Sequence, residues 1–430
     1  MVELKHLTWK RKDGPKIQTK ESTSRKKCTI VLPFDQENYM EKVEDPKMFR
    51  NELDPFIEKY PELFPYGIES GYSLKEVRRP KKTKIPIRRI MVGDVSYTIR
   101  PSFVMPYHTA FSDDVEKGLR LRKYDVPFWV LADLFGRDAM FWHRIEQSLG
   151  RNSIVGTTIK NPALLPEHLA ADEKHSKLKG NKVYVSTTAG AQCILGVSVS
   201  EDAGENGLKK TYSKFKEEAL DLNPEYRPKS VNTDGWRATV NTWMSIFPGI
   251  CVIACFLHVF IKIRDRSKKF GELFNAAADR IWHCYEASSK ASFSQRVRRL
   301  CEWVDAENLP AVISKPIMKL KENLASFSKS YDLPGCHRTS NMVDRLMQRM
   351  DRHLFSTIYF HGSLAAAELS IRGWALIHNF APCNPTTVKR HDGWRCPAEW
   401  LNKSRYHENW LQNLLTSASM GGFRYPPNPL

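Results

Sequence analysis

The spacing of hydrophobic positions changes several times along the chain, and each change predicts a different kind of structure. From residue 28 to residue 110, short apolar runs alternate with prolines, which predicts a small domain of mixed strands and helices. Residues 111–160 carry apolar positions at helical spacing, and Gly136 divides them in the manner of a helix-turn-helix. Arg144 and Gln147 of the second helix would then face the major groove of DNA, although an ordinary helical hairpin gives the same pattern.

The next part of the chain, residues 161–258, predicts a sheet. Hairpin links at Gly180-Asn181 and Gly190-Ala191 would join the first three strands. The expected elements are strands at 168–179, 182–188 and 193–199, a helix at 207–222, a strand ending at Asp234, a helix at 238–247 and a strand at 250–254. This order resembles the RNase H fold, an α/β fold with a mixed five-stranded sheet and flanking helices. In that fold the first and fourth strands lie side by side.

Helical spacing returns after residue 258. Residues 259–335 predict an all-α insertion that interrupts the core. Residues 336–382 contain the last helices of the core, the first of which begins near Asn341 after a good N-cap region. Residues 383–430 are expected to form a C-terminal tail.

The charge of the chain suggests its partner. There are 66 Lys and Arg against 48 Asp and Glu, giving a net charge of +18, and such a surplus favours binding to a polyanion, although a merely basic enzyme would also have it. Residues 1–27 are predicted to be a disordered basic arm. A second basic stretch, expected to contact phosphate without reading sequence, contains Arg78, Arg79, Lys81 and Lys82.

Composition also bears on the cellular compartment. Apolar runs of about 18 residues and the apolar core of a signal peptide are both missing from the sequence, so we expect no membrane association. The nine cysteines, an odd number, favour reduced thiols, Cys383 and Cys396 among them. We therefore expect a cytoplasmic protein associated with the bacterial nucleoid, or a nuclear one in a eukaryotic host.

A constellation of acidic residues carries the chemistry. Asp234 closes a predicted strand, Gly235 frees the following turn, and Cys255 and His258 follow at Cys-x-x-His spacing. The arrangement resembles the Mutator-like and related insertion-sequence transposases, in which Cys-x-x-His follows the second catalytic Asp.

Two further segments resemble the same transposases. Asp172 matches the first catalytic Asp on the opening strand of the core, and Thr339-Ser340-Asn341 leads into Asp344 as the Thr-Ser-Asn of these enzymes leads into their third acid. The resemblance covers residues 165–382. These transposases usually have Glu as the third acid, so Asp344 departs from the pattern, and Glu368 is the reserve candidate.

The resemblance implies a DNA transposase of the acidic-triad (DDE/DDD) kind, in which Asp172, Asp234 and Asp344 hold two Mg²⁺ ions, with Mn²⁺ able to substitute. Such ions activate the attacking oxygen and stabilise the leaving one during cleavage and strand transfer. Crowded carboxylates repel one another, so the site should be unfavourable until metal arrives. The implied partners are the double-stranded DNA of the transposon ends and the target, and further copies of the chain in a homodimer or higher oligomer.

Several alternatives stay open at this point. His258 is expected to point into the catalytic pocket, where it contacts a phosphate or orients Asp234. A structural zinc site is the alternative for this region, with four ligands: Cys255, His258, Cys336 and His337. Trp282 either stacks on a displaced base or packs in the core of the insertion. For the whole protein, the alternatives are a transposase-derived DNA-binding protein without catalysis and a metal-dependent nuclease of the same fold.

Overall fold

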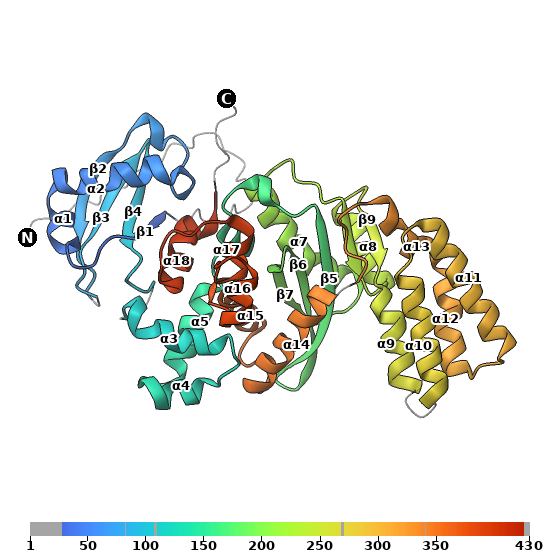
Figure 1. Cartoon of the computed structure of the whole chain (residues 1–430). Coiled ribbons are helices and arrows are strands. Elements are labelled where there is room, and N and C mark those ends of the chain that lie inside the picture. Colours follow the sequence, from blue (N-terminus) through green and yellow to red (C-terminus); the bar gives the residue numbers. More distant parts are fainter. Residues whose placement is uncertain (1–27, 82, 107–109, 268–270, 340, 425–430) are drawn as a thin grey trace, which may run out of the picture.

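The computed structural model describes the chain over residues 28–81, 83–106, 110–267, 271–339 and 341–424. The predicted disordered arm at 1–27 and Lys82 lie outside the described residues. Three parts follow one another across the molecule: a small N-terminal sheet, a central sheet covered by helices, and a helical bundle at the far end (Figure 1). Among the described helices, none has both the length and the apolarity that crossing a bilayer requires.

The N-terminal region is a mixed four-stranded sheet with two helices packed against it. Its strands lie in the order β1-β4-β3-β2, with β1 parallel to β4 and the other neighbours antiparallel. The elements are β1 (Thr29–Leu32), α1 (Tyr39–Glu44), α2 (Pro46–Lys59), β2 (Ser73–Arg78), β3 (Ile87–Val92) and β4 (Val95–Pro101). Burial alternates along β3 and β4, so Ile90 and Ile99 point into a core that Phe49 of α2 completes.

The central sheet is mixed and has five strands. They lie in the order β7-β6-β5-β8-β9. The strands are β5 (His168–Leu178), β6 (Asn181–Gly190), β7 (Cys193–Ser200), β8 (Ser230–Thr233) and β9 (Cys251–Ala254). β5, β6 and β7 are antiparallel neighbours, whereas β5, β8 and β9 run parallel. The prediction that the first and fourth strands of this region lie side by side is therefore confirmed.

Both hairpin turns lie one residue away from their predicted positions. The first turn is formed by Lys179 and Gly180, and the second by Ala191 and Gln192. All four residues have positive φ, between 47° and 83°, which suits the twist of two-residue hairpins. Gly190 ends β6 instead, where a Cβ would lie 2.9 Å from the Cγ atom of Pro166, so glycine serves close packing there and not the turn.

The two faces of the central sheet have separate cores. The covering helices are α7 (Glu205–Leu222) and α8 (Arg237–Ile246) on one face, and α14 (Asn341–Ser356) and α15 (Leu364–Phe380) on the other. Ala171 of β5 packs in the core under α7 and α8, and Ala170 packs in the core under α14 and α15. Because side chains alternate along a strand, Asp172 shares the α14 face and Glu173 shares the face of α7 and α8.

The helices of residues 111–160 share the core of α14 and α15. These helices are α3 (Ser112–Arg122), α4 (Phe128–Phe135), α5 (Ala139–Leu149) and α6 (Ile154–Thr158). α5 lies so close to α15 that a Cβ on Gly150 would be 2.0 Å from the carbonyl oxygen of Leu369. Arg122 and Glu146 form a fully buried ion pair of 2.9 Å in the same region. The predicted helix-turn-helix region is thus continuous with the core.

The segment predicted as a C-terminal tail is folded as far as residue 424. It contains α16 (Pro385–Arg390), α17 (Pro397–Asn402), α18 (Trp410–Ser417) and a short 3₁₀ helix (Ser419–Gly422). The Ser419 hydroxyl accepts from the Val31 amide (3.2 Å) and donates to the Leu63 carbonyl oxygen (2.9 Å). The end of the chain therefore returns to the N-terminal region and joins it to the central one.

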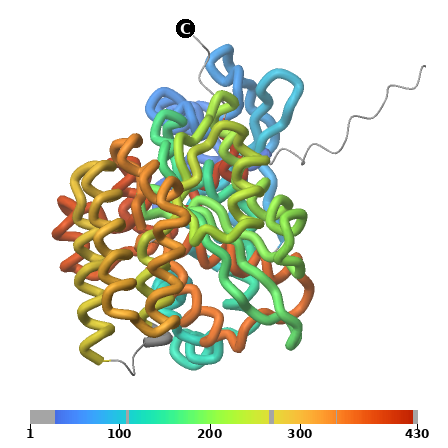
Figure 2. The backbone as a smooth tube through the Cα atoms, turned by 90° about the vertical axis from the view of Figure 1, so that its right-hand side faces the viewer, coloured from blue at the N-terminus to red at the C-terminus, as the bar shows by residue number. Residues whose placement is uncertain are grey.

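The helical insertion begins three residues earlier than predicted and has a core of its own. Its helices are α9 (Phe256–Ser267), α10 (Gly271–Tyr285), α11 (Lys290–Ala306), α12 (Ala311–Glu322) and α13 (Leu324–Ser328). They lie side by side as a bundle when the molecule is viewed from the insertion end (Figure 2). The bundle starts directly after β9, and the Phe256 amide donates to the Arg338 carbonyl oxygen (3.2 Å) where the chain returns. The insertion is therefore anchored at both ends beside the central sheet.

Candidate active site

Asp172 lies near the middle of β5, half-buried on the face that α14 covers. The pKa of Asp172 is raised to about 7, first by burial and then by the carboxyl groups of Glu173, Asp234 and Asp344 in that order of size, against a backbone hydrogen bond that lowers it. These acids come from three separate segments of the chain. The repulsion predicted for crowded carboxylates is thus present at Asp172.

Asp234 follows the last residue of β8 and is half-buried. Ala170 of β5 pairs with Asn232 of β8 in parallel register, so the strand neighbours Asp172 and Asp234 each lie two residues beyond the same pair. The Asp234 Oδ1 atom accepts a hydrogen bond from the Trp236 amide (2.7 Å), and Gly235 between them has φ of 83°. This turn fixes the carboxylate at the end of the strand, where the sheet opens toward the insertion.

Asp344 lies in the first turn of α14 and is half-buried. α14 packs across β5, which brings this helix start toward Asp172. The amide groups at a helix N-terminus favour a negative charge, so they support a carboxylate at this position. The preceding Ser340 of the predicted Thr-Ser-Asn lead lies outside the described residues.

The reserve candidate for the third acid, Glu368, lies elsewhere. It projects from α15 toward β7, two strands away from β5. Its Oε2 atom accepts from the Lys214 ammonium group (2.5 Å) and from the Ser198 hydroxyl (3.2 Å). Glu368 is therefore held by an ion pair at the β7 edge of the sheet, three strands away from β8, which Asp234 follows.

Glu173 is a buried acid that the sequence analysis did not select. Its Oε1 atom accepts hydrogen bonds from the hydroxyl groups of Tyr212 (2.7 Å) and Thr239 (2.7 Å). The pKa of Glu173 is raised to about 7, chiefly by burial and to a smaller extent by Asp234, although the hydrogen bonds from Tyr212 and Thr239 lower it. Adjacent acids on a buried strand were visible in the sequence, but only the partners on α7 and α8 reveal how the second one is held.

The donor set suits a hard divalent cation. Mg²⁺ prefers oxygen ligands and is commonly held by one or two carboxylates, with water and substrate phosphates completing the shell. The pKa of Asp172 is raised by burial and by its acidic neighbours, and a divalent cation would offset the repulsion among these carboxyl groups. Within the described residues, however, no three His, Cys, Asp or Glu side chains are close enough to hold one ion. The carboxylates thus fit the metal in chemistry, with substrate oxygens required to complete its shell.

The four residues of the alternative zinc site do not form a metal-binding group in the described part of the chain. Cys255 is buried at the end of β9, and the Cys336 thiol donates to the Ser330 carbonyl oxygen (3.3 Å). The carbonyl oxygen of His337 accepts from the Asn232 side chain (3.0 Å). All nine cysteines are free thiols.

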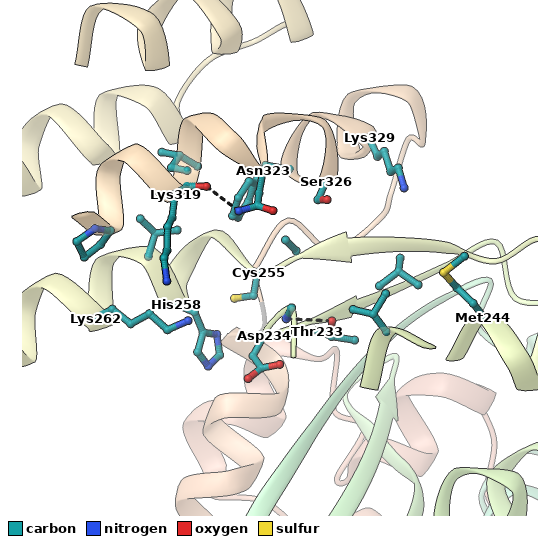
Figure 3. A pocket seen from close by; sticks show the side chains of 18 of the residues that line it. Thr233, Asp234, Met244, Cys255, His258, Lys262, Lys319, Asn323, Ser326 and Lys329 are labelled. Atoms are coloured by element: carbon teal, nitrogen blue, oxygen red, sulfur yellow. Dashed lines mark hydrogen bonds between the residues drawn. The ribbon is translucent and has the colours of Figure 1, made fainter. Parts of the chain in front are cut away.

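A pocket of about 290 Å³ separates Asp234 from the insertion. Its walls come from the ends of β8 and β9 and from α8, α9, α12 and α13. His258 of α9 lies in this pocket beside Asp234, as predicted, and the ammonium groups of Lys262 and Lys319 extend toward it (Figure 3). Lys262 follows His258 by four residues, a spacing that puts both on one face of a helix, whereas Lys319 is brought in from α12 by the tertiary structure.

The residues predicted to contact DNA lie in three different places. Arg79 at the end of β2 pairs with Glu44 (2.5 Å) and Arg78 with Glu76 (3.0 Å), while Lys81 beyond them is exposed. This group lies at the N-terminal end of the molecule, far from β8 and β9 (Figure 1).

The other two places are α5 and α10. Arg144 of α5 is exposed, but the Gln147 side-chain amide donates to the Ala366 carbonyl oxygen in the first turn of α15 (3.1 Å). The surface beside Arg144 carries large apolar side chains, with Trp129 69% and Met140 52% exposed. Trp282 of α10 is half-buried in an aromatic cluster of the insertion, with the ring of Phe260 5.3 Å away.

Comparison with protein-family models and with curated proteins finds no match to this chain.

Proposed function

We propose that the central sheet is an RNase H-like core and that the protein is a DNA transposase, which cuts DNA at transposon ends and joins the ends to a target. The observation that supports the proposal is that Asp234, which follows a neighbouring parallel strand, and Asp344, at a helix start, both lie near enough to Asp172 to raise its pKa. The strand order β7-β6-β5-β8-β9, with three antiparallel strands and two parallel ones, supports the core assignment.

The side chains have separate roles in this proposal. Asp172 and Asp234 bind Mg²⁺ from adjacent strands, and Asp344 approaches from α14. When bound, the metal lowers the pKa of an attacking water and stabilises the charge on the leaving oxygen. The hydrogen bond from the Trp236 amide to the Oδ1 atom of Asp234 holds that carboxylate in one orientation. Metal binding also relieves the repulsion that raises the pKa of Asp172.

His258 contributes from the pocket. It lies beside Asp234, and its Nδ1 atom is buried without a hydrogen-bond partner within the described part of the chain. A phosphate oxygen of the DNA strand is a suitable partner for the N–H of this imidazole. We assign it the role of orienting the strand beside Asp234.

The test is cleavage and joining of DNA that carries the inverted repeats flanking the coding region, in Mg²⁺ and in Ca²⁺. We expect the native protein to cut and join only in Mg²⁺, and Asp344→Ala to bind the same DNA without cutting it. Asp351→Ala is the matched control, because Asp351 lies on the same helix and pairs with Lys174 (2.6 Å) away from the acidic cluster. Cutting without joining would indicate the nuclease, and binding without cutting would indicate the DNA-binding protein that lacks catalysis.

A further inference from the structure

We propose that the pocket between Asp234 and the insertion binds a backbone phosphate of the DNA strand through Lys262 and Lys319. This inference rests on the proposed function for the identity of the strand. The two lysines come from different helices, α9 and α12, and both extend toward His258 and Asp234 (Figure 3). The pocket also contains Lys329, which lies at its opposite end.

The charges of the pocket favour an anion. Lys262 and Lys319 are both exposed to solvent, and in the part of the chain that the structure describes neither forms an ion pair with a carboxylate. Two ammonium groups that face one another repel, and a phosphate between them removes this repulsion and forms charge-assisted hydrogen bonds. The Nδ1 atom of His258, which has no hydrogen-bond partner among the described residues, supplies a further donor in the tautomer that carries the proton on Nδ1.

The shape and remaining walls of the pocket favour a nucleotide within a strand. Its volume of about 290 Å³ lies at the lower end of the range of small-ligand sites. The pocket also has apolar wall residues, among them Val240, Met244 and Leu320. Such a wall suits a sugar or base, while the lysines take the adjoining phosphate.

Because Asp234 lines the same pocket, we expect phosphate binding there to depend on a divalent metal ion. The Asp234 carboxylate repels an isolated phosphate, and a divalent cation bound to it removes this repulsion. We therefore expect the lysines and the metal to act together on neighbouring groups of one strand. The insertion would in this way position the strand that the acidic cluster cuts.

The experiment measures binding of a fluorescent single-stranded oligonucleotide by anisotropy in Ca²⁺, which permits binding without requiring cleavage. The salt dependence is compared for the native protein, the double variant Lys262→Gln/Lys319→Gln, and Lys321→Gln. Lys321 is a matched control because it lies exposed on α12 but faces α11, outside the pocket. Thermal unfolding of all three proteins checks that each remains folded.

We expect the double variant to bind about tenfold more weakly and to lower the slope of log K against log salt by about 1, because one phosphate contact is lost. Lys321→Gln should match the native protein in both quantities. An unchanged slope in the double variant, or failure of the native protein to bind the strand, would overturn the proposal. The proposal would also be overturned if a free mononucleotide bound in the pocket and the oligonucleotide did not displace it, because the site would then serve a small ligand.

The two proposals fail separately in this design. If the native protein binds the oligonucleotide through the lysines but never cuts DNA in Mg²⁺, the phosphate site stands and the transposase assignment falls. If it cuts and joins DNA while the double variant binds with an unchanged slope, the phosphate site falls and the transposase assignment stands.

Discussion

The two faces of β5 carry adjacent acids in opposite surroundings. Asp172 faces α14, where its neighbours include further carboxyl groups, whereas Glu173 faces α7 and α8, where two hydroxyl groups donate to it. Both have a pKa raised to about 7, first by burial, and Asp234 contributes to both shifts. Side-chain hydrogen bonds from Tyr212 and Thr239 lower the pKa only at Glu173, whereas Asp344 raises the pKa only at Asp172. The difference indicates that a raised pKa alone does not identify a functional acid, and that the chemistry of the neighbours separates a site for ligands from a buried structural contact.

The largest effect expected from this comparison is on activity. Asp172→Asn and Asp234→Asn should each lower the cleavage rate at least about 10³-fold, because metal-assisted stabilisation of the transition state amounts to several kcal/mol. Glu173→Gln keeps an oxygen that can accept from Tyr212 and Thr239, and should retain activity within about tenfold. Single-turnover cleavage in Mg²⁺ measures all three. Equal losses in Asp172→Asn and Glu173→Gln would place both acids in the active site.

The loss of stability should be larger for substitution of Glu173 than of Asp172, which is the reverse of the order expected for activity. Glu173→Ala removes the acceptor of the Thr239 hydroxyl and the shorter hydrogen bond of the Tyr212 hydroxyl, which keeps only a longer one to the Asp172 carbonyl oxygen (3.4 Å), so it should lower the free energy of unfolding by about 2–4 kcal/mol. Asp172→Ala removes a repelled carboxyl group and should change it by less than about 1 kcal/mol. Urea unfolding of the metal-free proteins provides the measurement. A larger loss in Asp172→Ala than in Glu173→Ala would contradict the contrast between the two faces.

The pH dependence of stability follows from the raised pKa values. An ordinary Asp or Glu in the unfolded chain loses its proton near pH 4, whereas Asp172 and Glu173 keep theirs in the folded state up to about pH 7. Folding is therefore favoured below pH 4, and this contribution is lost as the pH rises to 7, by roughly 1–2 kcal/mol after allowance for solvent and for coupling between the acids. Urea unfolding across this window should show the decline, and Asp172→Asn should reduce it by about half. A flat profile in the native protein would contradict the shifts.

The smallest effect is expected for Glu368, the reserve candidate for the third acid. Glu368→Ala breaks a partly exposed ion pair with Lys214 and should lower stability by no more than about 1 kcal/mol while leaving cleavage unchanged. Thermal unfolding and the cleavage assay test both parts. Loss of cleavage in this variant together with full activity in Asp344→Ala would exchange the roles of the two acids.

Local pattern accounted for most of the elements around the site. Alternating apolar positions gave the extents of β5, β6 and β7 to within a few residues, and helical spacing gave α7, α8 and α14. The predicted positions of the hairpin turns differ by one residue from the observed ones. For the second turn the reason is that a glycine can serve either a turn or a close contact. Gly190 serves the contact with Pro166, which no local pattern indicates.

Long-range packing limited the rest of the prediction. The segment after residue 383 resembled a tail because its polar residues and prolines interrupt the helical pattern. In the structure, buried hydrogen bonds such as that between Ser419 and Val31 satisfy those polar groups. Likewise, Gln147 looked available to DNA because its partner, the carbonyl oxygen of Ala366, lies 219 residues away in the chain.

The sequence by itself determined the order of strands and helices around the central sheet and the basic character of the chain, because these depend on residue type and local spacing, while Asp172, Asp234 and Asp344 were selected through a resemblance to a family. Only the tertiary structure decided which acids influence one another, how Glu173 is held, and that Lys319 lines the same pocket as Lys262 and Asp234. The physical reason is that electrostatic and hydrogen-bond energies depend on distances between side chains. Packing of helices and strands that are remote in sequence sets those distances.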